Sequence, residues 1–122
     1  MNEKETIAVI GLWHLGEVYA ACLADLGHKV IGWDKDDCVV TNLNAGILPL
    51  PEPGLQEKIM DNLKRHRLSF TSEISNIKDC DIIWLTFDTP VNDQDEVDLQ
   101  PIWDFLNNAV GFFKEDLLLI IS

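Results

Sequence analysis

Two glycines and the residues between them have the spacing of a loop that binds a dinucleotide phosphate. In the segment VIGLWHLGEV, Gly11 and Gly16 match the first and third glycines of the pattern Gly-x-Gly-x-x-Gly, and Trp13 replaces the middle one. Gly11 permits a tight turn, and Gly16 permits close packing of a helix on a strand. The free N–H groups at the start of that helix would face a pyrophosphate. We expect Trp13 either to turn outward or to fill the crevice and crowd the pyrophosphate.

An acidic residue at the end of the next predicted strand suggests which dinucleotide binds. Asp34 follows the run HKVIGW, 18 residues beyond Gly16. At that place a carboxylate accepts hydrogen bonds from the adenosine ribose and repels a 2′-phosphate, which favours NAD over NADP. The competing interpretation is a plain strand-to-helix turn followed by an acidic strand end, with no cofactor.

The hydrophobic periodicity alternates between strand-like and helix-like segments. Apolar runs predict strands, and an i, i+3, i+4 spacing predicts helices, the first with an apolar face of Leu15, Val18, Tyr19, Cys22, Leu23 and Leu26. The expected strands are 6–11, 28–34, 67–70, 81–87 and 117–121, and the expected helices are 15–26, 35–45, 55–63 and 102–113. This order predicts one α/β domain over residues 1–122, a doubly wound parallel sheet of the Rossmann-like, three-layer type. Its ligand crevice would lie at the carboxyl ends of the first and fourth strands.

Composition excludes several classes of function. The chain has 122 residues, 47% of them hydrophobic, and a formal net charge of −12. That charge disfavours nucleic acid as a partner, and no apolar run is long enough to span a membrane. The polar N-terminus differs from a signal peptide, so a cytoplasmic location is expected. Three widely spaced cysteines, Cys22, Cys38 and Cys80, are predicted to be buried small side chains, with no metal site.

Two further segments carry a specific family resemblance. LNAGILPLPEPGL contains Asn44, Gly46, Pro49 and the run Glu52–Leu55 in the order N-x-G-x-x-P-x-x-E-P-G-L, and LTFDTPVNDQDEVDL contains Thr89-Pro90. Together with VIGLWHLGEV and VIGWD, they resemble the N-terminal NAD-binding domain of the UDP-glucose/GDP-mannose dehydrogenase family. The resemblance covers essentially the whole chain.

The resemblance implies a cofactor site and places the catalytic residues elsewhere. It assigns to the NAD environment Gly11, Trp13, His14, Leu15, Gly16, Asp34 and Thr89. The family oxidises the primary alcohol of a nucleotide sugar to a carboxylate in two NAD-dependent steps, and its catalytic residues, including a nucleophilic cysteine, lie beyond Ser122. The chain is therefore expected to be a truncated, inactive cofactor half, with the nucleotide sugar bound by the missing C-terminal part. We expect it to be monomeric or weakly associating near 117–121, and its full-length parent to be a homodimer.

Two alternatives remain open from the sequence. The first is another Rossmann dehydrogenase, of the hydroxyacid or 6-phosphogluconate type; the E-P-G-L segment argues against it. A non-catalytic nucleotide-binding or interaction module that has lost the usual cofactor mode would explain Trp13 and the missing catalytic half.

Overall fold

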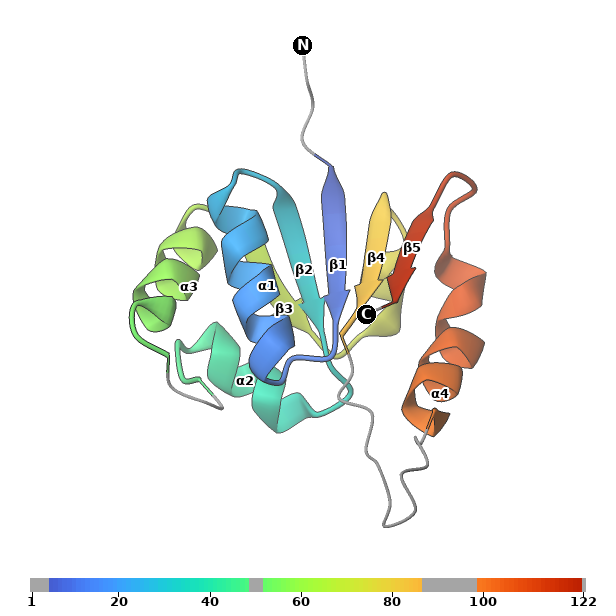
Figure 1. The fold of residues 1–122 in the computed structure, drawn as a ribbon, viewed down its shortest axis with the longest axis horizontal. Helices are drawn as coiled ribbons and strands as arrows, with labels where there is room; N and C mark the ends of the chain where they lie inside the picture. Colours follow the sequence, from blue (N-terminus) through green and yellow to red (C-terminus); the bar gives the residue numbers. More distant parts are fainter. Residues whose placement is uncertain (1–4, 49–51, 87–98, 122) are drawn as a thin grey trace.

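A parallel β-sheet forms the centre of the molecule. The computed structural model describes residues 5–48, 52–86 and 99–121, without the side chain of His14. The strands β1 (Thr6–Ile10), β2 (Lys29–Trp33), β3 (Leu68–Thr71), β4 (Ile82–Leu85) and β5 (Leu118–Ile121) pair in the order β3-β2-β1-β4-β5 (Figure 1). All four strand pairs are parallel. The predicted doubly wound α/β sheet is confirmed.

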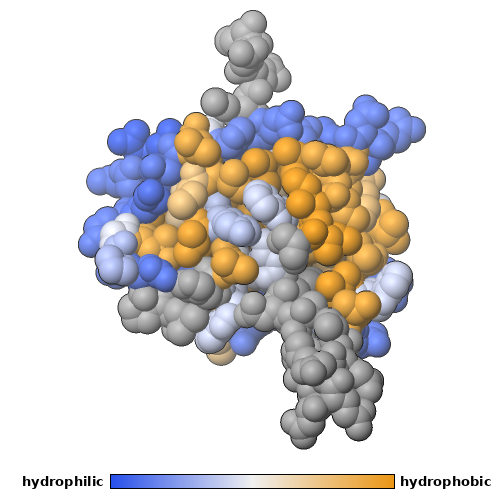
Figure 2. All heavy atoms as spheres, viewed as in Figure 1, coloured by the Kyte–Doolittle hydropathy of each residue, from blue (hydrophilic) through white to orange (hydrophobic). Residues whose placement is uncertain are grey.

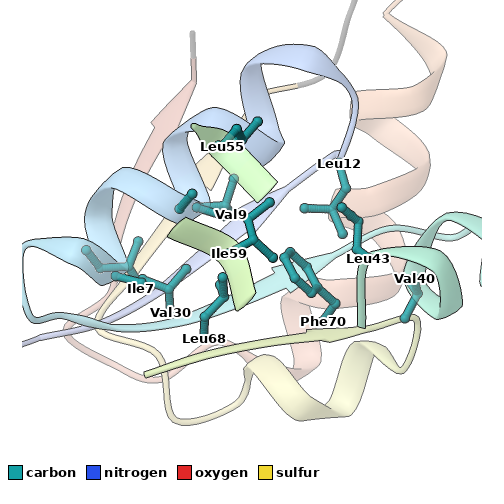
Figure 3. Packing of buried hydrophobic residues seen from close by; sticks show 13 residues of the cluster. Ile7, Val9, Leu12, Val30, Val40, Leu43, Leu55, Ile59, Leu68 and Phe70 are labelled. Atoms are coloured by element: carbon teal, nitrogen blue, oxygen red, sulfur yellow. The ribbon is translucent and has the colours of Figure 1, made fainter. Parts of the chain in front are cut away.

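Helices cover both faces of this sheet and make it the middle of three layers. On one face, α1 (His14–Asp25), α2 (Asp37–Asn44) and α3 (Leu55–Lys64) enclose a core with β1, β2 and β3, whose labelled side chains include Val9, Leu43 and Ile59 (Figure 3). On the other face, the 3-10 helix η1 (Ile74–Ile77), α4 (Gln100–Ala109) and the 3-10 helix η2 (Val110–Phe112) pack with Ile10, Trp33 and Ile83. The sequence analysis did not predict η1.

The face of α1 that packs on the sheet differs from the predicted one. Ala20, Ala21 and Ala24 are fully buried, whereas Leu15 and Leu26 are 45% and 67% exposed. Small side chains are buried here because they let α1 lie close to the strands. The size of the side chains, and not their hydrophobicity, therefore decided which face of α1 packs on the sheet. The larger Val18, Tyr19 and Leu23 are half-buried at the flanks of the helix.

The prediction that all three cysteines are buried is wrong for two of them. Cys80 is buried, and that burial raises its pKa to about 11. Cys22 is exposed on the outer side of α1, and Cys38 is exposed in the first turn of α2, where its N–H donates to the Asp36 side chain. Both side chains are exposed on the surfaces of their helices.

Two residues of the segment 44–55 explain part of its distinctive pattern. Asn44, the last residue of α2, pairs through its side-chain amide with both the N–H and the carbonyl of Phe70 on the edge strand β3. Leu55 begins α3 and is buried in the core below it. The described part of this segment therefore ties α2 and α3 to the edge of the sheet; Pro49 lies outside the described residues.

Apolar surface remains exposed where β4 and β5 lie. Leu118 and Ile121 are 55% and 57% exposed, and orange side chains gather over this part of the molecule (Figure 2). Beside them, the ring of Trp84 on β4 stacks on that of Tyr19 at 4.8 Å between ring centroids. In the part of the chain that the structure describes, no helix has the length and apolar character needed to cross a bilayer.

Candidate functional site

The loop between β1 and α1 has the backbone of a phosphate-binding turn. Gly11 has a φ of 93°, a value that side chains disfavour, and its N–H donates to the carbonyl of Trp33 at 2.8 Å. A Cβ on Gly16 would lie 1.7 Å from the Gly11 oxygen. Both positions therefore require glycine, as the sequence predicted, and the chain turns directly from the strand into the helix.

Trp13 turns outward, which is one of the two outcomes expected for it. It precedes the first residue of α1 with a φ of −87°, a value that any residue adopts, and its side chain is 48% exposed. The neighbouring Leu12 points inward instead and is fully buried. The turn therefore forms without the middle glycine.

Asp34 connects the end of β2 to this loop. Its Oδ2 accepts a hydrogen bond from the N–H of Leu12 at 2.8 Å, and its Oδ1 accepts one from the N–H of Asp36 at 2.9 Å. The residue is half-buried. Each carboxylate oxygen can accept a second hydrogen bond, so Asp34 can hold the loop and still receive ribose hydroxyls.

Thr86 fixes the loop from the other side and was missed by the sequence analysis. It follows β4, is 3% exposed, and its Oγ1 lies 2.9 Å from the Gly11 oxygen and 3.0 Å from the Ile10 oxygen. The hydroxyl thus directs its one proton at this pair of carbonyls, where the turn begins. A threonine at a strand end is common, so the sequence held little signal for this role.

Glu17 is a second residue that the sequence analysis missed. It lies in the first turn of α1, its N–H donates to the Trp13 carbonyl at 3.0 Å, and its side chain is fully buried. Burial, with a smaller contribution from Glu52, raises the pKa of Glu17 from its ordinary value of 4.5 to about 7. A carboxyl that is partly neutral at physiological pH therefore lies next to Gly16.

A cavity of about 690 Å³ opens beside Asp34. Its walls come from the ends of β2 and β3, from the segment that leads into η1, and from α4; the residues are Trp33, Asp34, Lys35, Ser72, Glu73, Ile74, Pro101, Asp104, Phe105 and Asn108. Trp33 and Phe105, both buried, form the apolar part, with their rings 5.2 Å apart. The cavity has the size and mixed polarity of a site for a nucleoside.

The remaining predicted site residues are placed less fully. Leu15 lies in the first turn of α1 with its side chain 45% exposed, and His14 begins the helix, its side chain outside the description. Thr89 and the acidic loop around it lie outside the described residues. Gly11, Trp13, Gly16 and Asp34 therefore come together at the carboxyl ends of β1 and β2, and Thr89 remains a prediction.

A glycine turn, a helix N-terminus and a strand-end aspartate on a parallel sheet define a Rossmann-type dinucleotide-binding domain. Residues 5–122 match the model of the UDP-glucose/GDP-mannose dehydrogenase family, NAD binding domain. The chain belongs to this family, as its resemblance implied.

Individual relatives agree with this assignment. UDP-glucose 6-dehydrogenase TuaD of Bacillus subtilis is 39% identical over 94 residues, which are 76% of this chain and 20% of that protein. UDP-glucose 6-dehydrogenase of Rickettsia typhi is 33% identical over 117 residues, or 95% of this chain and 27% of that protein. The chain thus spans roughly a quarter or less of the length of these relatives.

Solved structures show the same fold. A UDP-glucose dehydrogenase from Pyrobaculum islandicum superposes with a TM-score of 0.89 at 27% identity, covering 98% of this chain and 28% of that one. A ternary complex of GDP-mannose dehydrogenase from Pseudomonas aeruginosa superposes with a TM-score of 0.86 at 28% identity, covering 94% of this chain and 27% of that one.

Proposed function

We propose that this domain binds NAD across the carboxyl ends of β1 and β2. The pyrophosphate lies over the turn from Gly11 to Gly16, where the N–H groups at the start of α1 are directed. The adenosine ribose lies against Asp34, and the exposed Trp13 and Leu15 border the site. The observation that carries this proposal is Asp34, because one half-buried carboxylate holds the loop at Leu12 and keeps acceptor sites for ribose.

The cavity beside Asp34 receives the adenine base. Its apolar floor of Trp33 and Phe105 offers ring surface for a purine, and Asp34, Glu73 and Asp104 give its rim more negative than positive charge. A 2′-phosphate would meet this negative rim, so the cavity disfavours NADP.

The complete protein oxidises the primary alcohol of a nucleotide sugar, with the sugar nucleotide bound by a C-terminal part. Relatives named as UDP-glucose 6-dehydrogenases and GDP-mannose dehydrogenase support this reaction class. The cofactor supplies the hydride acceptor, and the described residues bind and orient it. The 122-residue chain alone is inactive, and the complete protein works as a homodimer in the cytoplasm.

Calorimetric titration of this chain with NAD and with NADP tests the cofactor proposal. We expect the wild type to bind NAD more tightly than NADP. Asp34→Ala should weaken NAD binding by about 1.5–3 kcal/mol and reduce the difference in affinity between NAD and NADP. The control is Asp116→Ala, which removes the same charge from an exposed turn before β5, at the opposite edge of the sheet. Equal NAD affinity in wild type and Asp34→Ala would remove Asp34 from the site.

A further inference from the structure

Glu17 is a buried acid at the start of the phosphate-binding helix. Among the residues that the structure describes, neither of its carboxyl oxygens has a hydrogen-bond partner, and the residue has no exposed surface. Ionising such a group is costly because the charge loses water and gains no donor. Burial without a hydrogen-bond donor therefore favours the neutral form of this carboxyl.

The helices and strands that the structure describes around Glu17 offer it no compensating cation. Glu52, which precedes α3, is the charged residue that acts on it, and its negative charge opposes ionisation. Strands β1, β3 and β4 contain no titratable side chain, and Lys29 of β2 is exposed. On α3, Lys58 pairs with Asp25 at 3.7 Å. The charge state of Glu17 thus depends on pH and on any new charge brought near it.

A bound pyrophosphate would bring such a charge. Glu17 follows Gly16 within the first turn of α1, where the N–H groups carry the positive end of the helix dipole. An ionised Glu17 partly cancels that positive end, whereas a neutral Glu17 leaves it available to an anion. The proton on Glu17 and an anion above the turn therefore stabilise each other.

We infer that Glu17 makes cofactor binding proton-linked: the neutral carboxyl favours the dinucleotide pyrophosphate, and its ionisation weakens binding. This inference rests on the proposed NAD function and adds a regulation to the same site. By reciprocity, NAD binding raises the pKa of Glu17, so that a fraction of a proton is taken up there on binding. A pyrophosphate diester has no proton to lose in this range, so the pH dependence belongs to the protein.

Titration of the chain with NAD at pH 6 and at pH 8.5 tests the inference. We expect the Kd to rise roughly five- to tenfold between these values, a coupling of ordinary size. Calorimetry near pH 7.5 in two buffers of different ionisation enthalpy should detect proton uptake on binding. In Glu17→Gln and Glu17→Leu, both neutral at position 17 at all pH values, the rise of the Kd with pH should shrink to about threefold or less, and the proton uptake at this site should disappear.

The variants separate Glu17 from other groups that titrate near neutral pH. Every other titratable group of the chain is intact in both variants, so any part of the pH slope that belongs to those groups is unchanged. A pH slope that survives undiminished in both variants therefore overturns the inference, as does a flat Kd in the wild type. Glu115→Gln, an exposed change at the opposite edge of the sheet, should retain the slope. Absence of NAD binding at pH 6 would instead reject the cofactor function itself, and this inference with it.

Discussion

The two faces of α1 differ in what they contact and in how large their side chains are. The inner face carries Gly16, Glu17 and three buried alanines against the sheet, and the outer face carries exposed Leu15, Cys22 and Leu26. The larger apolar residues thus lie outside and the smallest inside. The small inner residues let α1 lie close to β1, which brings the N-terminus of the helix to the carboxyl ends of the strands. The inner face therefore sets the shape of the glycine turn, and the outer face does not contribute to it.

The largest effect is expected where the inner face meets the loop. Gly16→Ala would place a Cβ 1.7 Å from the Gly11 oxygen and 2.9 Å from Thr86 Oγ1. We expect a loss of roughly 3 kcal/mol or more in the free energy of unfolding, because backbone atoms must shift. Urea denaturation measures this loss.

Gly111→Ala in η2 is the matched control, since a Cβ there meets nothing within 4 Å. Its stability should stay within about 1 kcal/mol of the wild type. If the two variants lost the same amount, close packing of the helix on the loop would not explain the need for Gly16.

A nearly equal effect is expected from the pH dependence of stability. The folded-state pKa of Glu17 is about 7 against an ordinary 4.5, so the folded chain holds a proton that the unfolded chain has lost between these values. The stabilisation is fully present below pH 4.5 and is lost as the pH rises to 7, by about 3 kcal/mol. Denaturation series at several pH values should show this decline in the wild type. A Glu17→Leu series with the same decline would contradict the assignment.

The smallest effect is expected at Trp13, which precedes the helix and belongs to neither face. Trp13→Gly should lower stability by about 0.5–1 kcal/mol through added backbone freedom. We also expect it to tighten NAD binding, because the indole, although it turns outward, borders the proposed pyrophosphate site and takes up space beside it. Calorimetry on both variants measures the change. Weaker binding after removal of the indole would make Trp13 a cofactor contact.

The sequence predicted the helices and strands of this fold well because hydrophobic periodicity and the positions of glycine and proline are local properties. The backbone need for Gly11 and Gly16 was predicted because it depends on local chain shape, and the position of Asp34 after β2 was predicted because it follows from the end of a strand. The orientation of α1 was not predicted, because hydrophobicity favoured leucines over alanines and the distance between helix and sheet is a tertiary property. Thr86 and Glu17 were missed for a related reason. The carbonyls that Thr86 contacts lie far from it along the chain, and the raised pKa of Glu17 comes mainly from its burial, so neither property is visible in the local sequence.

The hydrogen bond from Leu12 to Asp34 sets a limit on redesign of this domain. Exchanging the preferred dinucleotide would ordinarily begin by replacing the acidic residue after β2 with a neutral or basic one. Here that exchange also releases the buried end of the glycine loop, because Asp34 Oδ2 is the acceptor for the Leu12 N–H. Cofactor choice and loop shape therefore depend on the same carboxylate. An engineered switch to NADP needs a replacement acceptor for the Leu12 N–H, introduced together with the change at Asp34.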